Sequence, residues 1–301
     1  MTWITAAIAA AAGMGVVAIL DSHLLTKRIP SLRSFLLPIG IMHLVFGLVV
    51  LGIYPFPEEI GAVPLLVAFG SGIVRSAGAI IMLNTIRSQE ISRVIPVVHT
   101  YPIFVAILAV PVLGETLGSL QWLGIIITVA GAALISVQRD SSGQRTRLHK
   151  SFIILLGSSL LLGLANVGSK YALDYISFWN MYTVNSVCFG IIFLLMSARP
   201  RVLNEIRQIN QRGIALSLLL LNELLVVAGV ILFFWAIEQG PVSLVATITG
   251  TRPAFVFIFA LALSRIFPAV LEESLSRGII ALKVVSIALI VGGVTLLTLS
   301  A

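Results

Sequence analysis

The chain has 301 residues, of which 58% are hydrophobic and 10% are charged, and its mean hydropathy is +1.09. Soluble domains carry about 25% charged residues, so this composition excludes an ordinary soluble domain and predicts a protein that crosses the membrane several times. The net charge of +7 would favour nucleic acid or anionic lipid as the partner of a soluble protein. Here most basic residues fall in short loops, where membrane topology explains them, and we expect a lipid bilayer and no nucleic acid as partner.

The apolar residues form segments long enough to cross a bilayer, which takes about 20 residues each. Ten such segments follow one another, at 2–22, 35–54, 63–86, 91–113, 119–137, 151–173, 178–197, 213–237, 241–264 and 279–299. We therefore predict an all-α polytopic membrane protein with ten transmembrane helices. The first is expected to be retained rather than cleaved as a signal peptide, because the repeat described next requires it.

The longest polar connection, 139–150, separates five predicted helices from five. Aligning 76–110 with 227–261 without a gap gives 12 identities, among them glycine, proline, serine and threonine matches. Further on, Gly131 pairs with Gly293. We predict two five-helix repeats, 1–138 and 151–301, joined by this linker. Since each unit has an odd number of helices, the second enters the membrane inverted, as in many secondary transporters.

Prolines interrupt the fourth and ninth apolar segments, which are partners in the repeat. Pro96 and Pro102 lie in the first of them, and Pro253 matches Pro102 in the second. A proline inside a helix removes a backbone donor and kinks the helix, which neighbouring helices of a membrane bundle can accommodate. We predict that these three prolines are kink or gating positions. Next to them the two copies differ, because His99 and Tyr101 stand where the second copy has Gly250 and Arg252.

A few charges and polar groups fall inside the predicted spans, where they are costly and normally face a cavity or a partner. Arg75 and Arg252 lie near mid-span, whereas Lys170 and Lys283 lie close enough to helix ends to reach the interface. Residues predicted to bind substrate are Arg75, His99, Tyr101, Asn166, Lys170, Glu223 and Arg252.

Some of these residues have a structural alternative. Glu223 aligns with Gly72, one helical turn from Arg75, so the two charges could instead form an ion pair that holds the repeats together. His43 is expected to be a packing residue, and Asp21 is expected to face the membrane interface. Two histidines on different helices are too few to indicate a metal site, and no metal or other cofactor is expected.

The loop charges predict the topology. One set of alternate loops carries fifteen basic residues: Lys27, Arg28, Arg33, Arg87, Arg93, Arg139, Arg145, Arg147, Lys150, Arg199, Arg201, Arg207, Arg212, Arg265 and Arg277. The opposite loops carry none, only acids such as Glu58, Glu59, Glu115 and Glu238. Basic loops are normally cytoplasmic, so this distribution places both termini outside.

No motif of a known enzyme class is present, and we expect no catalytic activity. The sequence SRVIPVVHTYPIFVAILAVPVLGET at 92–116, followed by LGIIITVAGAALI at 123–135, resembles EamA-type transporters of the drug/metabolite transporter superfamily. The second half matches through TRPAFVFIFALALS and IVGGVTLL, but its turn at 267–274 lacks the Leu-Gly-Glu form of 113–115. The resemblance covers essentially the whole chain.

This resemblance implies a central cavity, lined mainly by helices 1, 3, 4, 6, 8 and 9, with access that alternates between the two sides. It also implies cytoplasmic termini, in conflict with the charge distribution, which is the better guide for this chain. Reporter fusions at both ends distinguish the two orientations.

The sequence therefore predicts a multi-pass protein of the bacterial inner membrane that transports a small organic metabolite. The arginines favour an anionic or zwitterionic substrate such as a carboxylate or an amino acid, and proton coupling through Glu223 or His99 is a further hypothesis. The alternative is a membrane scaffold or assembly subunit without transport, which would have paired charges and no cavity.

Overall fold

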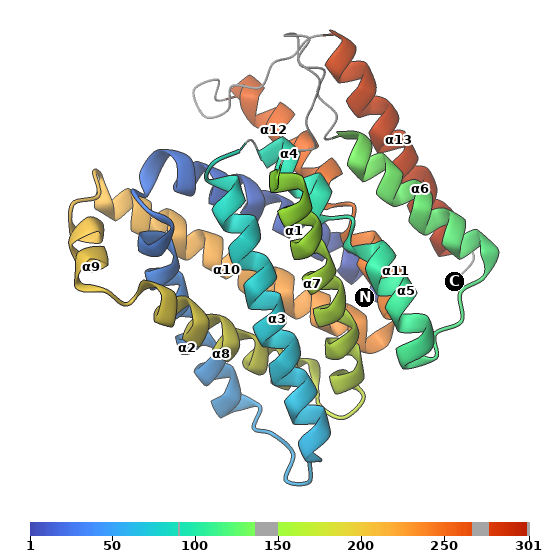
Figure 1. Cartoon of the computed structure of the whole chain (residues 1–301), viewed down its shortest axis with the longest axis horizontal. Coiled ribbons are helices and arrows are strands. Elements are labelled where there is room, and N and C mark those ends of the chain that lie inside the picture. The colour runs from blue at the N-terminus through green and yellow to red at the C-terminus, as the bar shows by residue number, and fades with distance from the viewer. Residues whose placement is uncertain (90, 136–149, 267–276, 300–301) are drawn as a thin grey trace.

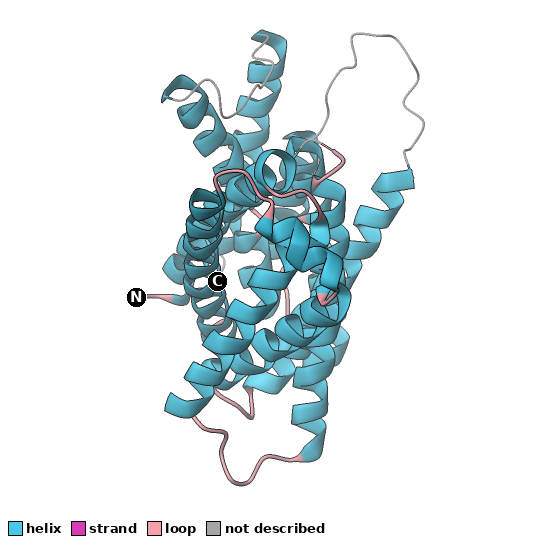
Figure 2. Ribbon diagram, turned by 90° about the vertical axis from the view of Figure 1, so that its left-hand side faces the viewer, coloured by secondary structure: helices cyan, strands magenta, loops and turns pink. Residues whose placement is uncertain are grey.

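The computed structural model describes residues 1–89, 91–135, 150–266 and 277–299, and within them it contains helices and connecting loops but no strand (Figure 2). Residues 139–149 of the predicted linker and the turn at 267–274 lie outside the described residues. In chain order (Figure 1), the elements are α1 (Trp3–His23), the π-helix η1 (Leu24–Arg28), α2 (Leu32–Ile53), α3 (Ala62–Ile86), α4 (Ile91–Val98), α5 (Tyr101–Leu113), α6 (Ser119–Ile135), α7 (Lys150–Leu173), α8 (Phe178–Ser197), α9 (Pro200–Arg207), α10 (Arg212–Gln239), α11 (Val242–Thr249), α12 (Arg252–Ile266) and α13 (Arg277–Leu299).

Eight segments of the described chain are long and apolar enough to cross a membrane. Two of them, Val94–Leu113 and Val242–Ala262, each contain a break between two helices. Two further apolar helices, Ser119–Leu134 and Val284–Leu299, are shorter than the others. An all-helical chain with this many apolar spans is a polytopic membrane protein.

The breaks in these two segments lie directly before Pro102 and Pro253. Neither proline has an N–H to donate to the carbonyl four residues earlier, so the helix cannot continue unchanged. Instead Thr100 Oγ1 donates to the carbonyl three residues earlier at 2.8 Å, and Thr251 Oγ1 does the same at 2.6 Å. The repeated Thr-X-Pro sequence thus ends one helix and starts the next in both copies. Pro96 lies inside α4, two residues before its end.

Helix α9 is an element that the sequence analysis did not predict. It is a short helix in a basic connection, and it is held against the start of α2. The Glu205 carboxylate accepts hydrogen bonds of 2.6 Å from both Ser31 Oγ and Ser34 Oγ. These two hydroxyls hold the pKa of Glu205 below its usual value, because they stabilise the ionised form.

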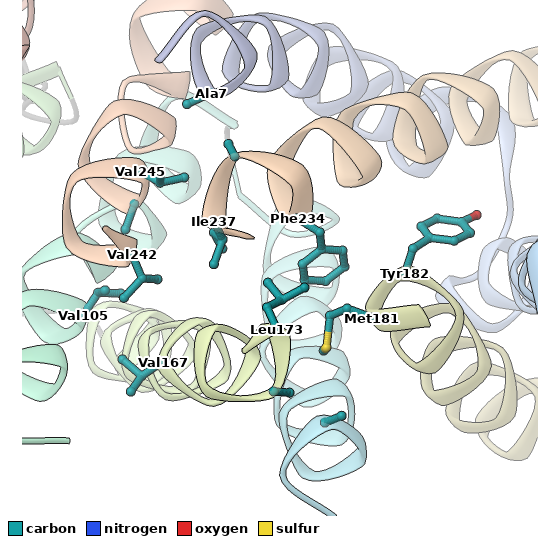
Figure 3. Close-up of a cluster of buried hydrophobic side chains, with 14 of the residues drawn as sticks. Ala7, Val105, Val167, Leu173, Met181, Tyr182, Phe234, Ile237, Val242 and Val245 are labelled. Carbon is teal, nitrogen blue, oxygen red and sulfur yellow. The ribbon is translucent and has the colours of Figure 1, made fainter. Parts of the chain in front are cut away.

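The helices pack in pairs that relate the two halves of the chain. α2 packs on α8, α6 on α13, α3 on α7, and α1 on α10. In Figure 1, α6 and α13 lie side by side at one edge of the bundle. One buried apolar cluster, drawn in Figure 3, contains Val105, Val167, Phe234, Ile237 and Val242. A second contains Leu24, Phe35, Ile86, Ile95 and Phe193.

We call the face that carries the connections 54–61, 114–118, 174–177 and 240–241 the acidic face. Two of its carboxylates bind the starts of helices elsewhere in the chain. Glu115 accepts hydrogen bonds from the first two backbone N–H groups of α11, at 2.5 and 3.3 Å, and from Ser243 Oγ. Glu238 accepts one at 2.9 Å from the N–H of Phe178, the first residue of α8. Carboxylates are favourable at helix N-termini, whose N–H groups lack partners within the helix.

The turn before Glu115 requires glycine. Gly114 ends α5 in the left-handed conformation, with φ of 68°, which other residues adopt only at a cost. This turn is the Leu-Gly-Glu sequence noted above, and its glutamate links the first half of the chain to the second.

Candidate functional site

A cavity of about 200 Å³ lies within the helix bundle. It is lined by residues from α1, α2, α3, α5, α7, α8, α10, α11 and α12 and by the end of α4 with the break that follows it. Most of the lining is aliphatic or aromatic. The polar and charged members are Asp21, His43, Arg75, His99, Tyr101, Asn166, Asn185, Asn222, Glu223, Thr249 and Arg252. α2 and α8 contribute to the wall, in addition to the helices that the resemblance implies.

Arg75 of α3 is bound to α7 through neutral groups. One terminal nitrogen donates to Asn166 Oδ1 at 2.8 Å, and the other donates to Ser169 Oγ at 2.9 Å. The guanidinium carbon lies 5.3 Å from the ring centres of both Phe233 and Phe234, within the range of cation–π attraction. Its Nε is buried without a hydrogen-bond partner. The arrangement fixes the position of the guanidinium and leaves its positive charge uncompensated by a carboxylate among the described residues.

Glu223 does not pair with Arg75, so the structural ion pair considered above is not formed. Instead Glu223 Oε1 lies 3.2 Å from His43 Nδ1, and both carboxylate oxygens are buried without a hydrogen-bond partner. His43 was expected to be a hydrogen-bonded packing residue, and the structure places it in the cavity wall facing Glu223. Helical periodicity shows which helices carry these groups but not how each helix is rotated, and rotation selects the partner.

Asp21 was expected at the membrane interface, and that expectation is wrong. Asp21 is buried, lines the cavity, and accepts a hydrogen bond of 2.8 Å from Asn222 Nδ2. It also lies within electrostatic range of Arg252. The sequence did contain an indication of this role, because an aspartate at the end of a long apolar segment is a candidate functional residue in a membrane protein.

The two helix breaks meet at the cavity. Tyr101 at the start of α5 shares a hydrogen bond of 2.8 Å with Thr249 at the end of α11. The rings of His99 and Tyr101 lie 5.4 Å apart. Arg252, the first residue of α12, is buried with its Nε unpartnered, and His99 Nδ1 is unpartnered too. Backbone that leaves the helix inside a membrane protein is tolerated where it lines a cavity, and such breaks are common substrate sites.

Lys170 is the predicted site residue that the structure places elsewhere. Its Nζ donates to the carbonyl oxygens of Ile237 and Glu238, at 3.0 and 3.3 Å, and it is not part of the cavity wall. These carbonyls belong to the last turn of α10, where a cation is favourable. The contacts support the structural explanation for Lys170. The other six residues predicted to bind substrate line one cavity, and their role in binding stays a prediction.

Within the part of the chain that the structure describes, no three His, Cys, Asp or Glu side chains are grouped as ligands for a metal ion.

Comparison with known proteins decides the family. The family model described as "EamA-like transporter family" matches residues 1–137 and 149–299. This chain belongs to the EamA-like transporter family. The EamA-like chain is therefore a member of the drug/metabolite transporter superfamily, whose members are transporters rather than enzymes.

Structural comparison agrees on the fold. A solved structure titled "Crystal structure of protein" superposes with a TM-score of 0.60, and the match covers 99% of this chain and 96% of the other. The two sequences are 16% identical, so this likeness shows the fold alone. Comparison with curated protein sequences gave no match.

Proposed function

We propose that this EamA-like protein is a secondary transporter that carries a small organic solute with an anionic group through the central cavity. The observation that carries the proposal is the pair of arginines in the cavity wall, of which Arg252 is buried and Arg75 is partly buried. Arg75 and Arg252 come from different halves of the chain, and each has an unpartnered Nε. No carboxylate lies within ion-pair distance of either among the described residues. Charged groups buried in a membrane span are costly, and an anionic substrate would compensate them.

The size of the cavity limits the solute. Pockets for drug-sized ligands measure roughly 300–1,000 Å³. The volume of about 200 Å³ found here suits a smaller molecule, such as a carboxylate or an amino acid. The mostly apolar wall favours a solute with an apolar body.

Alternating access requires two repeats that can rock against each other, and the packing supports an inverted repeat of 1–138 and 151–301. A Cβ added at Gly15 in α1 would lie 3.0 Å from Phe255 Cβ, and one added at Gly163 in α7 would lie 2.9 Å from Phe104 Cβ. Phe104 and Phe255 are matched positions of the repeat alignment. The same close contact is thus made twice, once from each half.

The alternative of a scaffold without transport predicts paired mid-span charges and no cavity. The cavity counts against it, and so does Arg75, which has no carboxylate partner among the described residues. We also propose that the protein lies in the bacterial inner membrane with its basic loops in the cytoplasm, because fifteen loop cations lie on one side of the predicted topology.

Transport after Arg252→Ala tests the proposal. Proteoliposomes with the wild-type protein are screened for uptake of labelled carboxylates and amino acids. For each compound transported, the variant is expected to lower the uptake rate about tenfold or more, because a hydrogen bond to a charged group contributes about 1.5–3 kcal/mol. Arg201→Ala is the control, since this side chain is 90% exposed on α9. Unchanged uptake after Arg252→Ala would contradict the proposal. Proton coupling through Glu223 or His99 further requires that an imposed pH gradient alters the wild-type rate.

A further inference from the structure

Apart from the Nδ1 atoms of His43 and His99, the unpartnered polar atoms of the cavity wall divide into donors and acceptors. Arg75 and Arg252 each leave a donor, Nε, without an acceptor. Glu223 Oε2, Asn222 Oδ1 and Asn185 Oδ1 are acceptors without a donor. All five residues line the cavity. The donors come from α3 and α12, whereas the acceptors come from α8 and α10.

The acceptor oxygens form part of a negatively charged region of the wall. Asp21 of α1 adds a second carboxylate, which accepts the hydrogen bond from Asn222. The two carboxylates lie within electrostatic range of each other. The groups that face them are the Asn222 amide, His43 Nδ1 at 3.2 Å from Glu223, and the guanidinium of Arg252 near Asp21.

These groups serve the two acids unequally. Asp21 has both the Asn222 amide and the nearby Arg252, while Glu223 has no hydrogen-bond partner among the described residues and lies 3.2 Å from His43 Nδ1. Burying an acceptor without a donor is unfavourable, so a cationic donor from the solute would satisfy the free oxygens of this region. Glu223 is the acid with the most unused capacity to accept hydrogen bonds.

We propose that Glu223, Asp21 and the side-chain oxygens of Asn222 and Asn185 bind a protonated amino group of the transported solute. A primary ammonium carries three N–H donors, one for each of the three residues Glu223, Asn222 and Asn185, whose side chains have unpartnered oxygens. This inference rests on the proposed transport function and makes the solute dipolar. Its ammonium group faces α8 and α10, and its anionic group faces Arg75 and Arg252.

Three small probes with related apolar bodies test the arginines and the acceptor oxygens of the cavity wall separately. 3-Methylbutylammonium carries only the cation, 4-methylpentanoate carries only the anion, and 3-methylbutanol carries neither. Titrations of purified protein, followed by thermal unfolding at constant ionic strength, give an apparent affinity for each. A ligand that binds the folded protein raises its unfolding temperature. We expect 3-methylbutylammonium to stabilise the wild-type protein more than 3-methylbutanol does.

Glu223→Gln is expected to lower the ratio of ammonium affinity to carboxylate affinity about tenfold, because the charged acceptor is lost. Glu59→Gln, in an exposed loop, is the control and is expected to keep the wild-type ratio. Asn185→Leu removes one acceptor without changing a charge. It is expected to lower the same ratio about threefold, which keeps the test valid if Glu223→Gln folds poorly.

Three results would overturn the inference. The ammonium probe could bind no better than the alcohol, or the ratio of ammonium to carboxylate affinity could stay unchanged in Glu223→Gln. Sodium chloride alone could also stabilise the protein as much as the ammonium probe does. The last would assign the site to an inorganic cation instead. Suppose that Arg252→Ala lowers the affinity for 4-methylpentanoate, but Glu223→Gln leaves the affinity for 3-methylbutylammonium unchanged. Only this inference then fails. If Arg252→Ala leaves carboxylate binding unchanged, the proposed function fails as well.

Discussion

Gly293→Leu is expected to lower the free energy of unfolding by about 1–3 kcal/mol or more, because α13 lies against α6 backbone to backbone. A Cβ at Gly293 would lie 2.7 Å from the carbonyl oxygen of Gly124 and 2.8 Å from the backbone N of Thr128. Backbone atoms cannot move aside as the end of a flexible side chain can. Small residues at helix–helix contacts let membrane helices approach this closely, and packing is a main attraction between helices in lipid.

The neighbouring glycine provides the control. Nothing described lies within 4 Å of a Cβ at Gly292, so Gly292→Leu adds the same apolar volume on the exposed side of α13. We expect Gly292→Leu to change the unfolding temperature little and Gly293→Leu to lower it, with Gly293→Ala in between. Thermal unfolding of the three purified variants measures this. Equal losses at both positions would contradict this explanation, because leucine favours a helix more than glycine does and only the close contact at Gly293 distinguishes the two sites.

The sequence was sufficient to predict most helices because the apolar segments are long and clearly bounded. The break near Pro102 and the break near Pro253 were also predictable, since proline removes a donor wherever it stands in a helix. The short helix α9 was not, because eight residues in a charged connection give too little periodicity. The ten-span, two-repeat arrangement remains part of our proposal, supported by the matching contacts of Phe104 and Phe255.

The sequence was sufficient to predict which residues belong to the candidate site, but not which contacts they make. Arg75, Arg252 and Glu223 stood out because charges in apolar segments are costly. The partner of each was not predictable. Arg75 binds Asn166 rather than Glu223, because the rotation and depth of α3 and α10 decide which groups meet. Lys170 shows the effect of depth, since it lies close enough to a helix end to reach backbone carbonyls instead of the cavity.

Glu115→Gln is expected to weaken the link between the two halves of the chain at the acidic face. The carboxylate accepts hydrogen bonds from two backbone N–H groups of α11 and from the hydroxyl of Ser243. Glutamine keeps one acceptor oxygen, loses the charge and turns an NH₂ group toward the same donors. Hydrogen bonds to a charged group contribute about 1.5–3 kcal/mol, so we expect a loss of about 1–3 kcal/mol in the free energy of unfolding.

The same substitution should also open the acidic face more often. α11 ends at Thr249, beside Tyr101 in the cavity wall, so loosening the start of α11 is expected to loosen one wall of the cavity. The measurement uses a cysteine at Val230, a cavity residue, in a chain whose single cysteine is replaced by Cys188→Ala. We expect Glu115→Gln to raise the rate at which a membrane-impermeant thiol reagent labels this cysteine from the acidic face.

Glu59→Gln removes a carboxylate from an exposed position on the same face, and it controls for surface charge. Its labelling rate and unfolding temperature are expected to match those of the parent chain. If Glu115→Gln lowered stability without raising the labelling rate, Glu115 would only cap α11. If both changed together, the closure of this face would depend on a hydrogen-bonded contact between the two halves. Such a contact can break and re-form during transport because it is small compared with the apolar packing around it.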